Sequence, residues 1–183
     1  MAAESPQDAA ELFLRPLRRA LSCITNEYLG GGYHPSRPTL LSFPNARNDG
    51  YIRLRSDHCQ LQTQRLIEFR LSYNYEITEG ADGWVAHTTG YNYAFQLDNG
   101  REIVAYHFDP RRRWKVQTPH LHVRGLAAPL ALSRAHFPTG RVSIEEVIRF
   151  AITELRVRPL LPDNLWQALL EETERAFISN PPP

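Results

Sequence analysis

Apolar residues near the start of the chain recur at the spacing of an amphipathic helix. Ser5 and Pro6 supply an N-cap and a first helical position, so the pattern predicts a helix over residues 5–29. Pro16 predicts a kink within it, and the glycines at 30–32 predict its end. The apolar stripe consists of Phe13, Leu17, Ala20, Leu21, Ile24 and Tyr28. One side of this helix is therefore expected to be buried.

From residue 39 to residue 125 the hydrophobic pattern changes to a period of two, which is typical of β-strands. The clearest case is RLIEFRLSYNYEI, residues 65–77, in which apolar and polar residues alternate along the whole segment. The segment GYNYAFQLDNGREIVAYHFD, residues 90–109, predicts a hairpin, because Asp98, Asn99 and Gly100 suit a tight turn. With shorter alternating segments on either side, the pattern predicts a meander of about five to seven strands.

The last part of the chain returns to helical spacing. Ser143 and Glu146 form a capping box before one apolar stripe, and a second helix follows the segment RPLLPDN, so two helices are expected within residues 143–178. The order helix, strands, helix, helix predicts an α+β fold, with an antiparallel sheet and the N-terminal and C-terminal helices packed on one face. We expect residues 1–183 to form one domain.

Composition narrows the class of protein. No apolar stretch reaches the roughly 18 residues that a membrane-spanning helix needs, so a soluble, cytoplasmic protein without a membrane partner is expected. Cys23 and Cys59 lack the spacing of a disulfide framework or a cysteine metal site. No serine-hydrolase, P-loop or dinucleotide-binding motif occurs. The net charge is only +1, so binding of nucleic acid would depend on local clustering of basic residues.

If helices cover the aromatic side of the sheet, the alternating polar residues form an open face. In the segment PHLHVR, Leu121 and Val123 should point inward, which places His120, His122 and Arg124 together on the open face. The other residues expected there are Arg53, Arg55, Glu68, Arg70, Asn92, Gln96, His107 and Asp109. A hairpin through the basic segment PRRRWKVQTP would bring His107 and Asp109 across from His120 and His122.

This arrangement favours cleavage of RNA without a metal ion or other cofactor. Histidine titrates near neutral pH, so one imidazole can take a proton from a ribose hydroxyl while a second gives one to the leaving oxygen. The candidate catalytic residues are His107, His120 and His122, with Asp109 orienting a histidine. The candidate substrate-binding residues are Arg53, Arg70, Arg111, Arg112, Arg113, Trp114, Lys115 and Arg124, whose charges and indole ring suit phosphates and a stacked base.

Two other interpretations of the same residues stay open. His107 with Asp109 and His120 with His122, on neighbouring strands, also have the spacing of a metal site. Alternatively, the basic, histidine-rich face is a non-enzymatic module that binds RNA or a partner protein. The remaining histidines, His34, His58, His87 and His136, lie near predicted loops and are expected to be isolated surface residues.

The middle of the chain resembles the TumE-like toxins of bacterial toxin–antitoxin pairs. The resemblance covers about residues 65–155 and consists of four short motifs. These motifs are Tyr91 with Tyr93, Gly100, Phe108 with Asp109, and His120 with His122. This chain differs from the family in its longer N-terminal region and its basic segment before His120. The resemblance implies a bacterial, cytoplasmic protein whose toxic activity is inhibited by a DNA-binding antitoxin protein.

Overall fold

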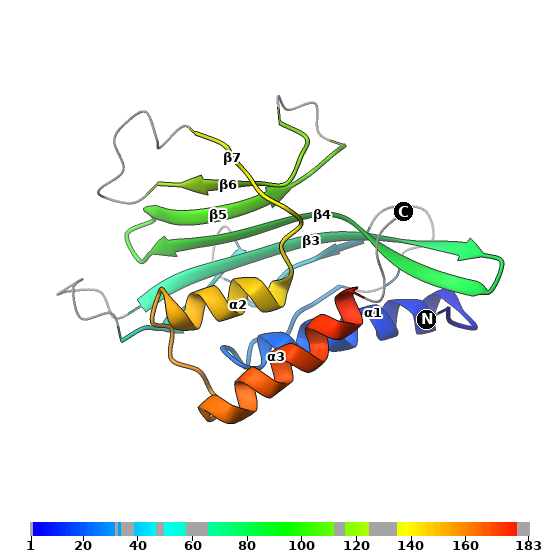
Figure 1. Ribbon diagram of the computed structural model, residues 1–183, viewed down its shortest axis with the longest axis horizontal. Coiled ribbons are helices and arrows are strands. Elements are labelled where there is room, and N and C mark those ends of the chain that lie inside the picture. Colours follow the sequence, from blue (N-terminus) through cyan, green and yellow to red (C-terminus); the bar gives the residue numbers. More distant parts are fainter. Residues whose placement is uncertain are drawn as a thin grey trace.

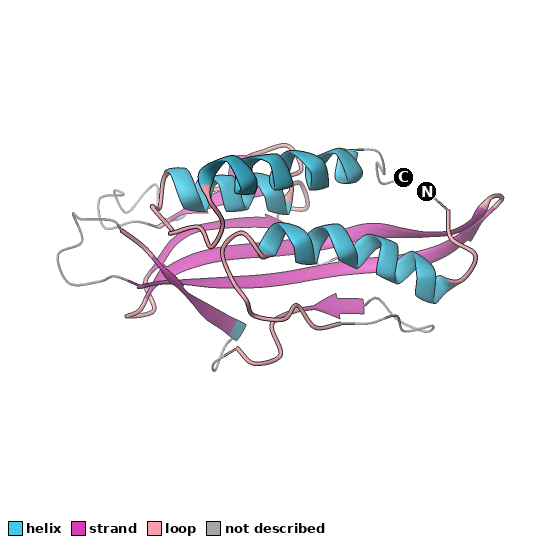
Figure 2. Ribbon diagram, turned by 90° about the horizontal axis from the view of Figure 1, so that it is seen from below, coloured by secondary structure: helices cyan, strands magenta, loops and turns pink. Residues whose placement is uncertain are grey.

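The computed structural model describes residues 2–31, 33, 39–46, 50–57, 66–111, 116–124 and 135–178 (Figure 1). It consists of a single antiparallel sheet with three helices lying along one of its faces, as the turned view also shows (Figure 2). The elements are α1 (Pro6–Leu21), β1 (Thr39–Leu41), β2 (Tyr51–Arg55), β3 (Leu66–Gly80), β4 (Gly83–Leu97), β5 (Glu102–Phe108), β6 (His120–Val123), β7 (Phe137–Pro138), α2 (Ile144–Thr153) and α3 (Asp163–Ile178). The predicted α+β fold is confirmed.

The strands follow the order β1-β3-β4-β5-β6-β7, and β2 also pairs with β3. β1 and β2 occupy the same edge of β3, because β2 pairs with residues 66–70 and β1 with residues 73–75. From β3 onward each strand pairs with the next one in the chain, which is the expected meander. β3 and β4 are the longest strands, with 15 residues each, and they pair along their whole length.

The structure differs from the predicted element boundaries in two places. The first helix ends at Leu21 and not at residue 29, although Ile24 and Leu29 are buried beyond its end. Their burial explains the difference. The segment after Leu21 is not helical, but it packs on the core, and its buried apolar residues happen to have the spacing of a helix. The sheet also extends past residue 125, since β7 pairs with β6. None of the described helices is long and apolar enough to cross a membrane.

The core lies between the helices and one face of the sheet. Alternation in β3 buries Phe69, Leu71, Tyr73 and Tyr75 on this face, and α2 begins with the predicted capping box at Ser143. The aromatic rings pack in pairs across neighbouring strands; for example, the ring centroids of Phe69 and Phe95 are 4.7 Å apart. Such cross-strand aromatic contacts stabilise a sheet beyond the burial of apolar area alone. The opposite face of the sheet is consequently free to carry polar chemistry.

Two buried tyrosines in this core should respond differently to loss of the hydroxyl group. The hydroxyl of Tyr73 is 2.6 Å from the Thr88 hydroxyl, whereas the buried hydroxyl of Tyr93 has no hydrogen-bond partner among the described residues. We expect Tyr73→Phe to lower the free energy of unfolding by about 1 kcal/mol. We expect Tyr93→Phe to leave that free energy unchanged or to raise it, because it removes an unsatisfied polar group. Denaturant titration of both variants measures the difference, and an equal loss of stability would contradict this account of the core.

Candidate functional site

The register between β5 and β6 determines which side chains meet on the open face of the sheet. His107 lies opposite His120, and Ala105 lies opposite His122. Because side chains alternate between the two faces, His107, His120 and His122 all lie on the face away from the helices. Leu121, between the two histidines, packs against the core. The predicted hairpin between these strands is therefore confirmed, and the structure supplies its register.

β7 adds a fourth histidine that the sequence does not reveal. Leu121 pairs with Phe137, and continuing this antiparallel register by one residue places His136 opposite His122. The ring centroids of these two histidines are 4.3 Å apart. His136 is exposed, as expected of a surface residue, but the expectation that it is isolated was wrong. With only two residues, β7 is too short to show a period of two, so no local pattern indicates this contact.

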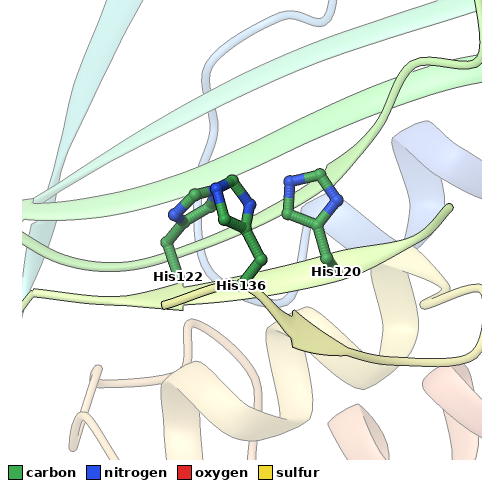
Figure 3. A group of neighbouring side chains, drawn as sticks. All are labelled: His120, His122 and His136. Atoms are coloured by element: carbon green, nitrogen blue, oxygen red, sulfur yellow. The ribbon is translucent and has the colours of Figure 1, made fainter. Parts of the chain in front are cut away.

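The four imidazole rings form a compact cluster, here called the histidine group: His107, His120, His122 and His136. Ring centroids are 5.6 Å apart for His107 and His120, 5.0 Å for His107 and His122, 5.0 Å for His120 and His122, and 4.9 Å for His120 and His136. Figure 3 shows three of these rings, His120 and His122 on β6 and His136 on the segment directly before β7, on the same side of the strands. The group is built entirely from the open face of the sheet and its last strands.

The surroundings of His107 and His122 favour the neutral form of these two rings. Burial, and after it the nearby His122, His120, Arg70 and Arg124, together lower the pKa of His107 to about 4. Burial also lowers the pKa of His122 to about 4, with contributions from His136, His120 and Arg124. Positive charges placed this close repel one another, so protonation of one ring opposes protonation of the next. At neutral pH these two rings are therefore uncharged, and each keeps a nitrogen lone pair that can bind a cation.

A backbone hydrogen bond fixes the orientation of His120. Its Nδ1 lies 2.7 Å from the carbonyl oxygen of Thr118, which can only accept, so Nδ1 carries the hydrogen. The free lone pair of this ring is therefore on Nε2. His120 is also the most buried ring of the group, with 7% of its surface exposed. Nδ1 of His122 is buried without a hydrogen-bond partner among the described residues.

Three of the four rings could hold a metal ion. His120, His122 and His136 each present one nitrogen, and these three nitrogens lie within 4.8 Å of one another. His107 stacks on His120 with an angle of 16° between the ring planes, but it is not part of this ligand set. The ligand set predicted from the sequence, which combined His107 and Asp109 with His120 and His122, therefore contains two of these three residues.

Asp109 lies directly after the end of β5, and its carboxylate takes part in a local contact. Oδ1 accepts a hydrogen bond of 3.3 Å from the backbone amide of Arg111. The side chain of Arg111 in turn forms an ion pair with Glu76 on β3. The structure therefore shows Asp109 shaping the turn after β5, and the role of orienting a histidine stays a prediction.

The predicted arginines on the open face have different partners. Nε of Arg53 lies 3.6 Å from Glu68, and Nε of Arg124 lies 3.3 Å from Glu102. The guanidinium group of Arg70 lies over the ring of Tyr51, at 5.0 Å from its centroid. The positive charges of Arg70 and Arg124 both contribute to the lowered pKa of His107. The other predicted substrate-binding residues, Arg112, Arg113, Trp114 and Lys115, lie outside the described residues.

Comparison of the chain with protein-family models, curated proteins and solved structures finds no match. The assignment of chemistry to the histidine group therefore depends on its geometry.

The site should depend on the close approach of Gly90 on β4 to Phe108 at the end of β5. A Cβ atom at Gly90 would lie 2.8 Å from the backbone carbonyl oxygen of Phe108, next to Asp109 and one residue from His107. We expect Gly90→Ala to destabilise the fold by about 1–3 kcal/mol, because a backbone atom cannot move aside cheaply. Gly140→Ala is the control, since nothing lies within 4 Å of a Cβ atom at that position. Thermal unfolding of the two variants compares them, and equal stability would contradict the close approach.

Proposed function

We propose that the protein cleaves RNA at the histidine group. The observation that carries this proposal is the convergence of four imidazole rings on the open face, with the lone pair of His120 Nε2 left free by the hydrogen bond to Thr118. Neutral imidazoles are efficient proton acceptors, and Arg70 and Arg124 bring positive charge to the same face. RNA supplies both the proton to be removed and the negative charge to be stabilised.

The proposed reaction needs only the RNA itself. His120 Nε2 takes the proton from a ribose 2′-hydroxyl, and the 2′ oxygen forms a bond to the adjacent phosphorus. The bond from phosphorus to the 5′ oxygen breaks, and this oxygen receives a proton from His136, the most exposed ring of the group. The products are a 2′,3′-cyclic phosphate and a free 5′-hydroxyl. Arg70 and Arg124 offset the charge that develops on the phosphate during the reaction.

The proposed biological setting is a bacterial toxin–antitoxin pair, as implied by the resemblance to TumE-like toxins. In this setting the substrate is the RNA of the cell that makes the protein, and a DNA-binding antitoxin protein is the partner. The alternative proposal, from a different class of function, is a non-enzymatic module that binds RNA or a partner protein through the same face. Arg124, with 52% of its side chain exposed, is available for either role.

Replacement of one histidine of the histidine group should distinguish a catalytic function from a binding function. We expect His120→Ala to slow cleavage of a single-stranded RNA by about 10²–10⁴-fold, because His120 is the proposed proton acceptor and this is the usual contribution of a proton-transferring group. His87→Ala is the matched control, because His87 lies on β4 opposite Glu76, outside the histidine group. Gel analysis of RNA after incubation with each protein measures the rates. Intact RNA with the wild-type protein, together with RNA binding in a mobility-shift assay, would favour the non-enzymatic module.

The toxin setting has its own test in living cells. We expect induced expression of the wild-type chain in a bacterial culture to arrest growth and to fragment total RNA, and His120→Ala, which removes the proposed proton acceptor, to relieve both effects. Growth curves and RNA gels taken at intervals measure the outcome. Growth arrest with intact RNA would indicate that the toxic target is not RNA. Normal growth, with the wild-type protein present in the same amount as the variant, would contradict the toxin setting.

A further inference from the structure

The histidine group has a feature that acid–base chemistry does not require. Three of its rings, His120, His122 and His136, direct one nitrogen each toward a common point, and these nitrogens lie within 4.8 Å of one another (Figure 3). In a tetrahedral site, with metal–nitrogen bonds of about 2.0–2.1 Å, such nitrogens are about 3.4 Å apart. The three nitrogens therefore lie close to the spacing of such a site, and the most exposed of the three residues is His136, directly before β7.

The strands that carry the three rings give the arrangement its rigidity. His120 and His122 are two residues apart on β6, so they lie on the same face, and His136 is the cross-strand neighbour of His122. Two rings from β6 and a third from the residue before β7 supply three nitrogen ligands, one fewer than a complete tetrahedral set. Metal sites with three protein ligands and an open position are typical of catalytic sites, whereas structural sites use four.

The hydrogen bond between His120 and Thr118 is of the kind that orients histidine ligands in metal sites. Metal-binding histidines donate the hydrogen of the second ring nitrogen to a carbonyl or carboxylate oxygen, which fixes the tautomer and directs the other nitrogen to the ion. His120 meets this condition, with Nδ1 at 2.7 Å from the Thr118 carbonyl oxygen and with only 7% of the residue exposed. The buried Nδ1 of His122, which lacks a partner among the described residues, is a second nitrogen that an ion would satisfy.

The types of ligand narrow the choice of ion. All three donors are imidazole nitrogens, which suit Zn²⁺, Ni²⁺, Cu²⁺ and Co²⁺, whereas Mg²⁺ and Ca²⁺ prefer oxygen. Neither a carboxylate nor a thiolate belongs to this ligand set. We infer that His120, His122 and His136 form a binding site for one divalent transition-metal ion, with an open position that faces the solvent side of the sheet.

This inference goes beyond the proposed function, because metal binding is measured without RNA. The two proposals use the same nitrogens, because a bound ion would occupy Nε2 of His120 and a nitrogen of His136, which the proposed cleavage uses for proton transfer. The metal-loaded chain is therefore expected not to carry out that cleavage, whereas the stripped chain is.

Direct titration tests the inference on the full, untagged chain after removal of metal with a chelator. We expect calorimetry with Zn²⁺ to show one ion per chain, Co²⁺ to give the absorption of a tetrahedral complex, and Mg²⁺ to show no binding. His136→Ala should weaken Zn²⁺ binding by at least about 100-fold, because loss of a ligand exceeds the effect of losing an outer contact. His136 is exposed, so this substitution leaves the fold intact, which circular dichroism checks.

His87→Ala is the matched control and should bind Zn²⁺ like the wild-type chain, since His87 lies outside the histidine group. Absence of Zn²⁺ binding by the wild-type chain, or equal binding by His136→Ala, would overturn the inference. RNA assays with stripped and Zn²⁺-loaded protein separate the two proposals. Metal binding without RNA cleavage by the stripped protein would support the metal site and contradict the proposed function. Cleavage of RNA by stripped protein that takes up no metal would support the proposed function and contradict the metal site.

Discussion

The antiparallel register between β5 and β6 is the constraint on which the candidate site depends. It places His107 opposite His120 and sets the alternation that turns His120 and His122 to the open face. A shift of one residue would turn Leu121 outward and the two histidines toward the core. The burial of Leu121 against the core therefore fixes the position of the imidazoles as firmly as any contact between the rings themselves.

One face of the sheet contributes stability, and the other carries the candidate chemistry. One face carries stacked aromatic rings that pack against the helices, and these contacts hold the strands in place. The other face gathers four imidazoles, of which two are held neutral by burial and by each other. Such a cluster is unfavourable on its own, because crowded titratable groups lose solvation without gaining partners. A cation coordinated by the ring nitrogens would give these groups a partner, which links the architecture of the sheet to a function at this face.

The sequence predicts the elements better than their contacts. Alternation runs from Ile67 to Ile77 in β3 and from Tyr91 to Leu97 in β4, and the capping box at Ser143 marks the start of α2. The same alternation places His107, His120 and His122 on one face. In contrast, the register within the hairpin and the contact between β6 and β7 depend on long-range pairing, which has no local signal. His136 was therefore missed, and Ile24 and Leu29 were assigned to a helix that ends earlier.

The central claim is that the fold brings His120, His122 and His136 to one point that suits a transition-metal ion. The most direct measurement is anomalous diffraction at the zinc absorption edge from crystals grown with Zn²⁺. The account predicts one strong peak at about 2.0–2.1 Å from a nitrogen of each of these three rings, with Nε2 as the ligand atom of His120. A map without a peak among the three rings, from crystals in which they are ordered, would contradict it.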